Sequence, residues 1–247
     1  PYVRERDPHT GFLNGPAVRQ YALELERLLV PQWNAGLVPV VLGGDCSILH
    51  GALVGLKRRG RTGLLYLDGH ADFYRGTTSQ TGEIADMGLA IAVGRNDPLL
   101  SDIDGLAAYV QPEDSVLFGF RDEAESLSAG MQGVRGSGVH CFDLQAIRRI
   151  GSDAAIEQAV NLLSGPRLDA GVFIHFDTDV LDDAVNPAVD YRMADGLAFD
   201  EVSRVIAAVR RTGRLRGISV SIFNPRLDPG GRVAKALTDC IVAGLRA

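Results

Sequence analysis

Acidic side chains gather directly after three short apolar runs of this sequence. The clusters read Gly43-Gly44-Asp45-Cys46-Ser47, Asp68-Gly69-His70-Ala71-Asp72 and Asp177-Thr178-Asp179. In the last two clusters the polar residues are two positions apart, and this spacing keeps side chains on one side of an extended backbone. Carboxylates that converge at one edge of a sheet repel one another unless cations neutralise them. Oxygen donors with one imidazole and one thiolate suit a divalent transition metal better than calcium. Two cations that share a carboxylate form the two-metal arrangement of many hydrolases.

Such clusters need strands that end at a common edge. Nearly continuous apolar runs predict six strands, at 38–44, 63–68, 115–120, 139–144, 171–177 and 217–222. Amphipathic segments predict helices at 15–29, 47–59, 153–163, 200–211 and 233–245. Alternating strands and helices indicate an α/β fold, here a three-layer α/β/α sandwich with a mostly parallel sheet. In such sheets ligands bind at the carboxyl ends of the strands, where the three clusters lie.

Length and composition exclude several classes of protein. The chain has 247 residues, 46% of them apolar and 23% charged, which favours one large globular domain over disordered, collagen-like or coiled-coil structure. A net charge of −6 argues against broad nucleic-acid binding. The sequence holds no apolar run of 18 residues, so we expect no membrane span. Its three cysteines are widely scattered, which is typical of a reducing cytoplasm.

The three clusters, together with Asn224-Pro225, resemble the motifs of the arginase–agmatinase (ureohydrolase) family in order, spacing and strand context. In that family the patterns GGDHS, DAHxD and SxDxDxxDP supply the ligands of two manganese ions. The resemblance implies an arginase-like catalytic domain over 1–247. It also implies that one ion is bound by Cys46, Asp68, Asp72 and Asp177, and the other by His70 and Asp179, with Asp68 and Asp177 bridging. The family sheet usually has eight strands, so six strands and a first residue Pro1 predict that a strand ahead of 2–10 is absent.

Cys46 departs from the family pattern, which has a histidine there. A thiolate brings a full negative charge, so five anionic ligands, instead of the usual four, would face two dications. We therefore expect a less electrophilic metal pair, a higher pKa for the bridging water and a preference for softer metals. The same change occurs in hydrolases similar to Nω-hydroxy-L-arginine hydrolase and in uncharacterised bacterial arginase-like proteins. The alternative is a small buried thiol without metal.

Two further departures concern the substrate. The loop 81–88 lacks the family's proton-shuttle histidine, and Glu83 or Asp86 could take over proton transfer. Glu83 could instead grip a guanidinium through paired hydrogen bonds, and either acid could simply cap a helix at 87–94. Ile222 stands where the family has a guanidinium-binding glutamate, which puts free arginine in doubt.

Other residues are candidates on weaker grounds. By resemblance, the loop with Arg121, Asp122 and Glu125 would bind a substrate's α-amino group, and Tyr191 would line the mouth of the pocket. For His50, four residues after Cys46, we favour packing beside the site over a ligand role. We expect His175 to face the opposite side of its strand from the Asp177 pair, in a structural role.

These residues favour a binuclear-metal hydrolase that cleaves a linear C–N bond of a guanidino compound, arginine-like or N-hydroxylated, to a urea-type product and an amine. Mn(II) is the metal that the resemblance implies, with Asp72 accepting the proton of the attacking water and passing it to the leaving amine. Family members are often trimers or hexamers, so a homo-oligomer is an option. Two alternatives stay open: a non-catalytic metal-binding relative, and an amide hydrolase that uses a single zinc ion.

Overall fold

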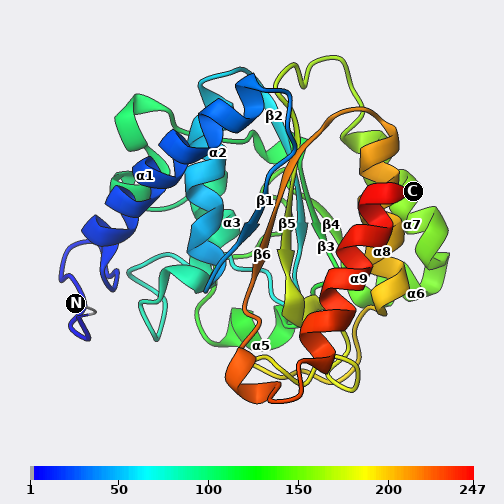
Figure 1. Ribbon diagram of the computed structural model, residues 1–247. Helices are drawn as coiled ribbons and strands as arrows, with labels where there is room; N and C mark the ends of the chain where they lie inside the picture. Colours follow the sequence, from blue (N-terminus) through cyan, green and yellow to red (C-terminus); the bar gives the residue numbers. More distant parts are fainter. Residues whose placement is uncertain (1–2) are drawn as a thin grey trace.

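A single six-stranded sheet forms the centre of the computed structural model, which describes residues 3–247 (Figure 1). Every strand pairing is parallel, in the order β1-β6-β5-β2-β3-β4. The strands are β1 (Val40–Leu42), β2 (Thr62–Leu67), β3 (Ser115–Phe118), β4 (His140–Phe142), β5 (Gly171–Asp177) and β6 (Leu215–Ser221). All six predicted strands are confirmed, although β1, β3 and β4 are shorter than expected. The predicted absence of a strand ahead of 2–10 concerns the start of the chain, where Pro1 and Tyr2 lie outside the described residues.

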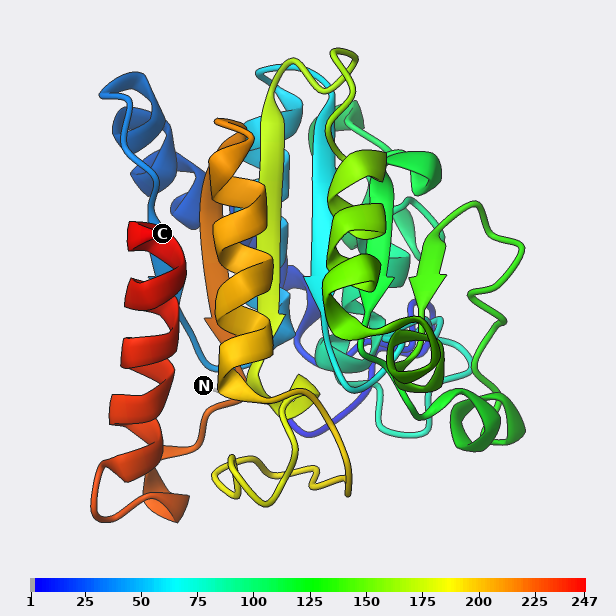
Figure 2. The same ribbon diagram turned by 90° about the vertical axis from the view of Figure 1, so that its right-hand side faces the viewer.

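Helices cover both faces of the sheet, which confirms the three-layer sandwich (Figures 1 and 2). One layer holds α1 (Gly15–Asn34), α2 (Leu49–Lys57) and α3 (Gly88–Ala92), and the other holds α6 (Leu144–Ile150), α7 (Ser152–Leu162), α8 (Phe199–Arg211) and α9 (Arg232–Arg246). Three helices were not predicted: α4 (Pro98–Ser101), α5 (Glu123–Ser128) and α6. Within residues 3–247, no helix combines the length and apolar character needed to cross a membrane.

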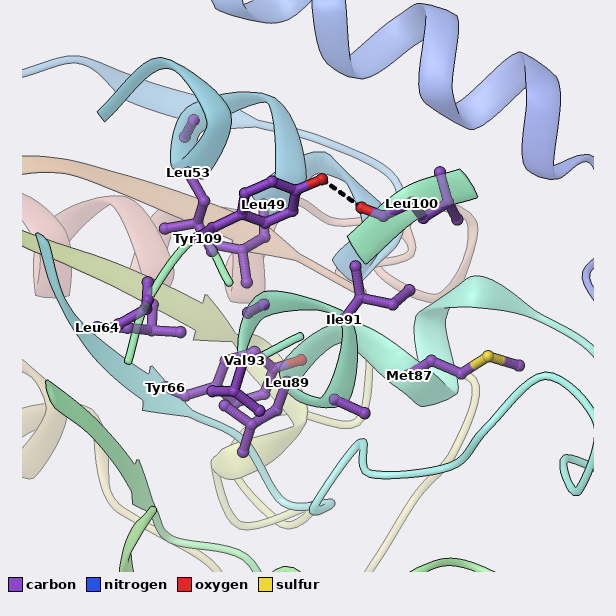
Figure 3. Packing of buried hydrophobic residues seen from close by; sticks show 14 of the residues in the cluster. Leu49, Leu53, Leu64, Tyr66, Met87, Leu89, Ile91, Val93, Leu100 and Tyr109 are labelled. Atoms are coloured by element: carbon purple, nitrogen blue, oxygen red, sulfur yellow. Dashed lines mark hydrogen bonds between the residues drawn. The ribbon is translucent and has the colours of Figure 1, made fainter. Parts of the chain in front are cut away.

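Alternation along the central strands divides the interior into two cores. Leu64 and Tyr66 of β2 pack toward α2 and α3, in the core drawn in Figure 3. Their neighbours Leu65 and Leu67 belong to the core under α7 and α8. Because both faces of β2 and β5 are buried, their sequences are almost continuously apolar until the strands end, and there the polar clusters begin.

The layer of α1 and α2 is unusually close-packed at Gly51. A Cβ atom at this position would lie 2.7 Å from the backbone oxygen of Ala22 and 2.8 Å from the Cβ of Leu25. Because α2 follows directly on the segment that carries Cys46, this helix contact also sets where that side chain lies.

We predict that Gly51→Ala destabilises the protein by about 1–3 kcal/mol, because the new methyl group would force a backbone contact apart. Urea denaturation followed by circular dichroism measures the change. Gly133→Ala is the matched control, since the nearest heavy atom to a Cβ there is 4.0 Å away. Equal stability of Gly51→Ala and wild type would contradict the close-contact argument.

Candidate metal centre

Two groups of side chains that could hold a metal ion meet at the carboxyl ends of the central strands. In the first group the ligand atoms of Cys46, Asp68, His175 and Asp177 all lie within 4.8 Å of one another. In the second group the same is true of Asp68, His70 and Asp179. Asp68 belongs to both groups, so the structure brings together five of the six predicted metal ligands around one shared carboxylate. Asp72, the sixth, belongs to neither group.

Local hydrogen bonds fix each cluster at its strand end. In all three clusters an aspartate accepts a hydrogen bond from the backbone N–H two residues further on, in an Asx turn. The pairs are Asp45 with Ser47 at 2.8 Å, Asp68 with His70 at 2.6 Å, and Asp177 with Asp179 at 2.8 Å. The turn at Asp45 caps the 3₁₀ helix η1 (Cys46–Ile48), and the turn at Asp177 caps η5 (Thr178–Val180). The spacing of aspartates in the sequence is therefore also a folding signal.

Cys46 is buried and points into the first group. Its thiol donates a hydrogen bond to Asp177 Oδ2 at 2.8 Å, and its Sγ lies 3.4 Å from Ser221 Oγ. Burial raises the pKa of the Cys46 thiol well above its usual range, and the negative charges of Asp177, Asp72 and Asp68 raise it further. A cation in this group would displace the thiol proton and bind the thiolate.

His70 lies beside two carboxylates of the centre, Asp68 and Asp179, and leaves the negative charge of the cluster in excess. Burial raises the pKa values of Asp68 and Asp177 well above their usual range, and charge repulsion within the cluster adds to both shifts. Asp68 Oδ2 is buried without a hydrogen-bond partner. His70 pairs with Asp179 at 3.0 Å between Nδ1 and Oδ2. Burial alone would raise the pKa of Asp179, but His70 holds it below its usual value. The donor types, the unpartnered oxygen and the uncompensated charge all fit a pair of divalent cations.

Asp72 lies beside the centre in a different arrangement. Its backbone adopts a left-handed φ of 47°, and its Oδ2 accepts a hydrogen bond from Tyr66 Oη at 2.5 Å. Burial and the charge of Asp68 raise the pKa of Asp72 well above its usual range. Tyr66 is fully buried and is the penultimate residue of β2, within the apolar run, so sequence analysis missed this contact.

His175 corrects the sequence analysis. The prediction that it faces away from Asp177 is wrong, because residues two apart in a strand share a face, and His175 belongs to the first group of ligand atoms. Its Nδ1 lies 2.8 Å from Ser219 Oγ and its Nε2 lies 3.5 Å from Ser221 Oγ. The same period-two spacing that identified Asp177 and Asp179 could have identified His175.

A cavity of about 560 Å³ leads to the centre. Besides ligand residues and Asp72, acidic side chains line it: Asp86, Asp122, Glu125 and Asp190. Its basic lining residues are His70, paired with Asp179, and Arg192, which forms an ion pair with Asp183 at 3.1 Å. The excess of negative charge suits a cationic ligand. Tyr191 is 57% exposed and also lines the cavity, as predicted.

The predicted loop acids lie in different places. Asp86 lines the cavity and accepts hydrogen bonds from Thr81 Oγ1 at 2.5 Å and Ser79 Oγ at 3.4 Å. The alternative that Asp86 or Glu83 caps the following helix is wrong, because neither carboxylate caps η2 (Ile84–Met87) or α3. Glu83 is half-buried outside the cavity lining, although its charge raises the pKa of Tyr191.

Arg121 also lies outside the cavity lining. Its guanidinium donates hydrogen bonds to the backbone carbonyls of Asp179 at 3.0 Å, Met193 at 3.2 Å and Ala194 at 3.2 Å. Gly69 makes room for it, since a Cβ atom there would lie 2.6 Å from Arg121 Nη1. Arg121 therefore connects the turn at Asp179 to the segment of Met193 and Ala194. Its neighbours Asp122 and Glu125 line the cavity.

Ile222 lines the cavity in a strained conformation. Its φ of 67° is unusual for a β-branched residue. A hydrogen bond of 2.7 Å from its N–H to the carbonyl of Gly44 holds the backbone in place. Strain of this kind is typical of functional sites.

Comparisons with known proteins find one family and its fold. The family model of the arginase family matches residues 14–244. An arginase from Bacillus caldovelox is 31% identical over 202 residues, which cover 81% of this chain and 65% of that protein. The chain therefore spans just under two thirds of the length of that relative. The crystal structure of arginase from Bacillus subtilis subsp. subtilis str. 168 superposes with a TM-score of 0.86 at 26% identity, covering 100% of this chain and 82% of the other. The native structure of the B. caldovelox arginase gives a TM-score of 0.86 at 27% identity, with 99% and 82% covered.

His50 gives a test of the electrostatics behind the centre. It is fully buried in α2, neither ring nitrogen has a hydrogen-bond partner, and burial lowers its pKa to about 4. The unfolded chain takes up a proton on this histidine near pH 6.5, whereas the folded protein takes it up only near pH 4. His50 therefore lowers the free energy of unfolding as the pH falls through this window.

We predict that His50→Leu becomes more stable relative to wild type by about 3 kcal/mol between pH 7 and pH 4. Urea titrations of both proteins at several pH values in this window measure the difference. Parallel stability curves would show that His50 is not held neutral in the folded protein.

Proposed function

This chain belongs to the arginase family, and from that premise we propose that it is a metal-dependent ureohydrolase. In this proposal residues 1–247 act as one catalytic domain that hydrolyses a C–N bond of a guanidino compound to a urea-type product and an amine. The observation that carries the proposal is the shared position of Asp68 between two groups of ligand atoms at the end of a negatively charged cavity.

Five side chains are proposed to hold two divalent metal ions. Cys46, Asp68 and Asp177 hold one ion, and Asp68, His70 and Asp179 hold the other. Bound there, the ions would supply positive charge to polarise the substrate and to lower the pKa of a water nucleophile. Manganese is the first metal to test, because the family resemblance implies it. The second group supports two ions rather than the single zinc of an amide hydrolase.

The chain's own residues then bind the substrate and move its protons. The acidic cavity attracts a guanidinium, and Asp86 is better placed than Glu83 to bind it because only Asp86 lines the cavity. Asp72 accepts a proton from the attacking water and returns it to the leaving amine. Tyr66 donates to Asp72 Oδ2 and so leaves Oδ1 for this exchange.

The identity of the substrate depends on the cavity wall. Ile222 offers no charge to a guanidinium, which argues for a substrate that differs from free arginine at the reacting end. An N-hydroxylated arginine is one such compound. Asp122 and Glu125 lie where they could bind an α-amino group.

The proposal also covers the cellular compartment and the oligomeric state. Its three cysteines, Cys46, Cys141 and Cys240, are all free, which supports a reducing compartment such as the cytoplasm. A homo-oligomer stays a prediction from the family resemblance.

We expect steady-state turnover, measured as release of urea or hydroxyurea, on at least one of arginine, Nω-hydroxyarginine, agmatine and related guanidines after loading with manganese. Chelation of the metal should lower the rate by at least about 100-fold, since the cations supply several kcal/mol of the activation, and added metal should restore it. Bound metal without turnover across the panel would favour a non-catalytic relative instead.

We also expect Cys46→Ala to lose one metal ion per chain and Cys46→His to keep two, because imidazole can replace the thiolate as a donor. Elemental analysis after dialysis measures the content. Cys240→Ala is the matched control, since this thiol is equally buried but lies in α9 in the other helical layer. Unchanged metal content in Cys46→Ala would exclude a ligand role for this cysteine.

A further inference from the structure

We infer that His175 is the nitrogen ligand of the metal ion on the Cys46 side, in the place that the family resemblance gives to Asp72. This inference rests on the proposed two-metal site and concerns which residues of this chain complete it. Neither the family pattern, which has a serine at this position, nor the predicted set of ligands includes His175.

The position of His175 in the sheet directs it toward the centre. It pairs in register with Tyr66 of β2 and Ser219 of β6, one step before the row of Asp177 and Ser221. The ring is fully buried, and it stacks at 4.5 Å between centroids against the ring of Tyr66. A side chain enclosed in this way on a central strand has little freedom to rotate, so a ligand role needs no reorganisation.

The two ring nitrogens of His175 have different surroundings. Nδ1 lies 2.8 Å from Ser219 Oγ, and in the tautomer with a proton on Nδ1 it donates to that hydroxyl and leaves a lone pair on Nε2. Nε2 lies 3.5 Å from Ser221 Oγ, and this hydroxyl is 3.4 Å from Cys46 Sγ and 3.3 Å from Asp177 Oδ2. The free nitrogen therefore faces the same small space as the thiol and the carboxylate.

Asp72 is less suited to this place. Its Oδ2 is engaged by Tyr66 Oη at 2.5 Å, and its carboxylate belongs to neither group of mutually close ligand atoms. The position beside the cavity leaves Asp72 free to exchange protons with a substrate, which is the role proposed above.

The charge of the centre favours the same assignment. With Asp72 as a ligand, the anionic donors would be five: Cys46, Asp68, Asp72, Asp177 and Asp179. Two dications neutralise only four, and an excess charge buried in the protein is costly. Replacing Asp72 by the neutral ring of His175 leaves four anionic donors to match two dications, while Asp72 beside the centre keeps the hydrogen bond from Tyr66. The extra negative charge of the thiolate at position 46 is thus offset by a neutral imidazole, at position 175, in place of a carboxylate ligand.

The donor set also indicates the class of metal. One thiolate, one imidazole and two carboxylates suit zinc or cobalt better than manganese on the Cys46 side. His70, Asp68 and Asp179 form a harder set, which suits manganese on the other side.

Cobalt(II) alone is the probe for this assignment, because thiolate-bound cobalt gives a charge-transfer band in the near ultraviolet. Wild type, His175→Gln, Asp72→Asn and the control His50→Gln are titrated, with bound cobalt counted by elemental analysis and folding checked by thermal denaturation. We expect wild type and His50→Gln to bind two ions and show the band. His175→Gln should bind the Cys46-side ion at least about 10-fold more weakly, with the band shifted or lost. Asp72→Asn should keep both ions and the band.

The opposite pattern would overturn the inference: full cobalt binding and an unchanged band in His175→Gln, with loss of one ion in Asp72→Asn. His175→Asn is the second variant in case glutamine does not fit the buried space. A wild-type protein that binds two ions but hydrolyses no guanidine would refute the proposed activity and leave the ligand assignment standing. A wild-type protein that binds no cobalt would overturn the ligand assignment, and the proposed activity is tested separately by turnover with manganese.

Discussion

Repulsion among buried acids at the end of the sheet is the constraint on which the rest of the structure depends. Asp68 and Asp177 are buried beside Cys46, and charge repulsion within this cluster adds to the effect of burial on each pKa. The chain tolerates this only because strong elements hold the side chains: strands buried on both faces, Asx turns at their ends and a helix packed at Gly51. Like charges buried at such a centre lower folding stability, and a bound cation would raise it again.

The parallel sheet explains why residues far apart in sequence share one site. β2 and β5 are neighbours and end at the same level, so clusters that start at Asp68 and Asp177 meet without any special connection. Cys46 follows β1 as the first residue of a short 3₁₀ helix. Strand β6, which lies between β1 and β5, contributes Ser221. On the side of the sheet that faces α2 and α3, Tyr66, His175 and Ser219 form a row. It lies two residues before the row of Asp177 and Ser221.

Much of this arrangement could be predicted from the sequence. The strands were predictable because both their faces are buried, and the acidic clusters because their polar residues follow these strands at a spacing of two, whereas the candidate ligand role of Cys46 came from the family resemblance. His175 carried the same signal, and the error lay in assigning its face. Asp72 was harder, since its contact with Tyr66 depends on a left-handed backbone turn that no spacing rule predicts. The conformations of Arg121 and Ile222 likewise depend on contacts with distant loops.

Arg121 has a consequence for how quickly a ligand reaches the centre. Its hydrogen bonds join the turn that carries Asp179 to the segment of Met193 and Ala194, next to Tyr191 at the mouth of the cavity. A mouth held in this way does not have to rearrange before a ligand enters, so capture is governed by diffusion in the negative field of the cavity. Cations should therefore associate faster at low ionic strength, and added salt should slow their association more than their release.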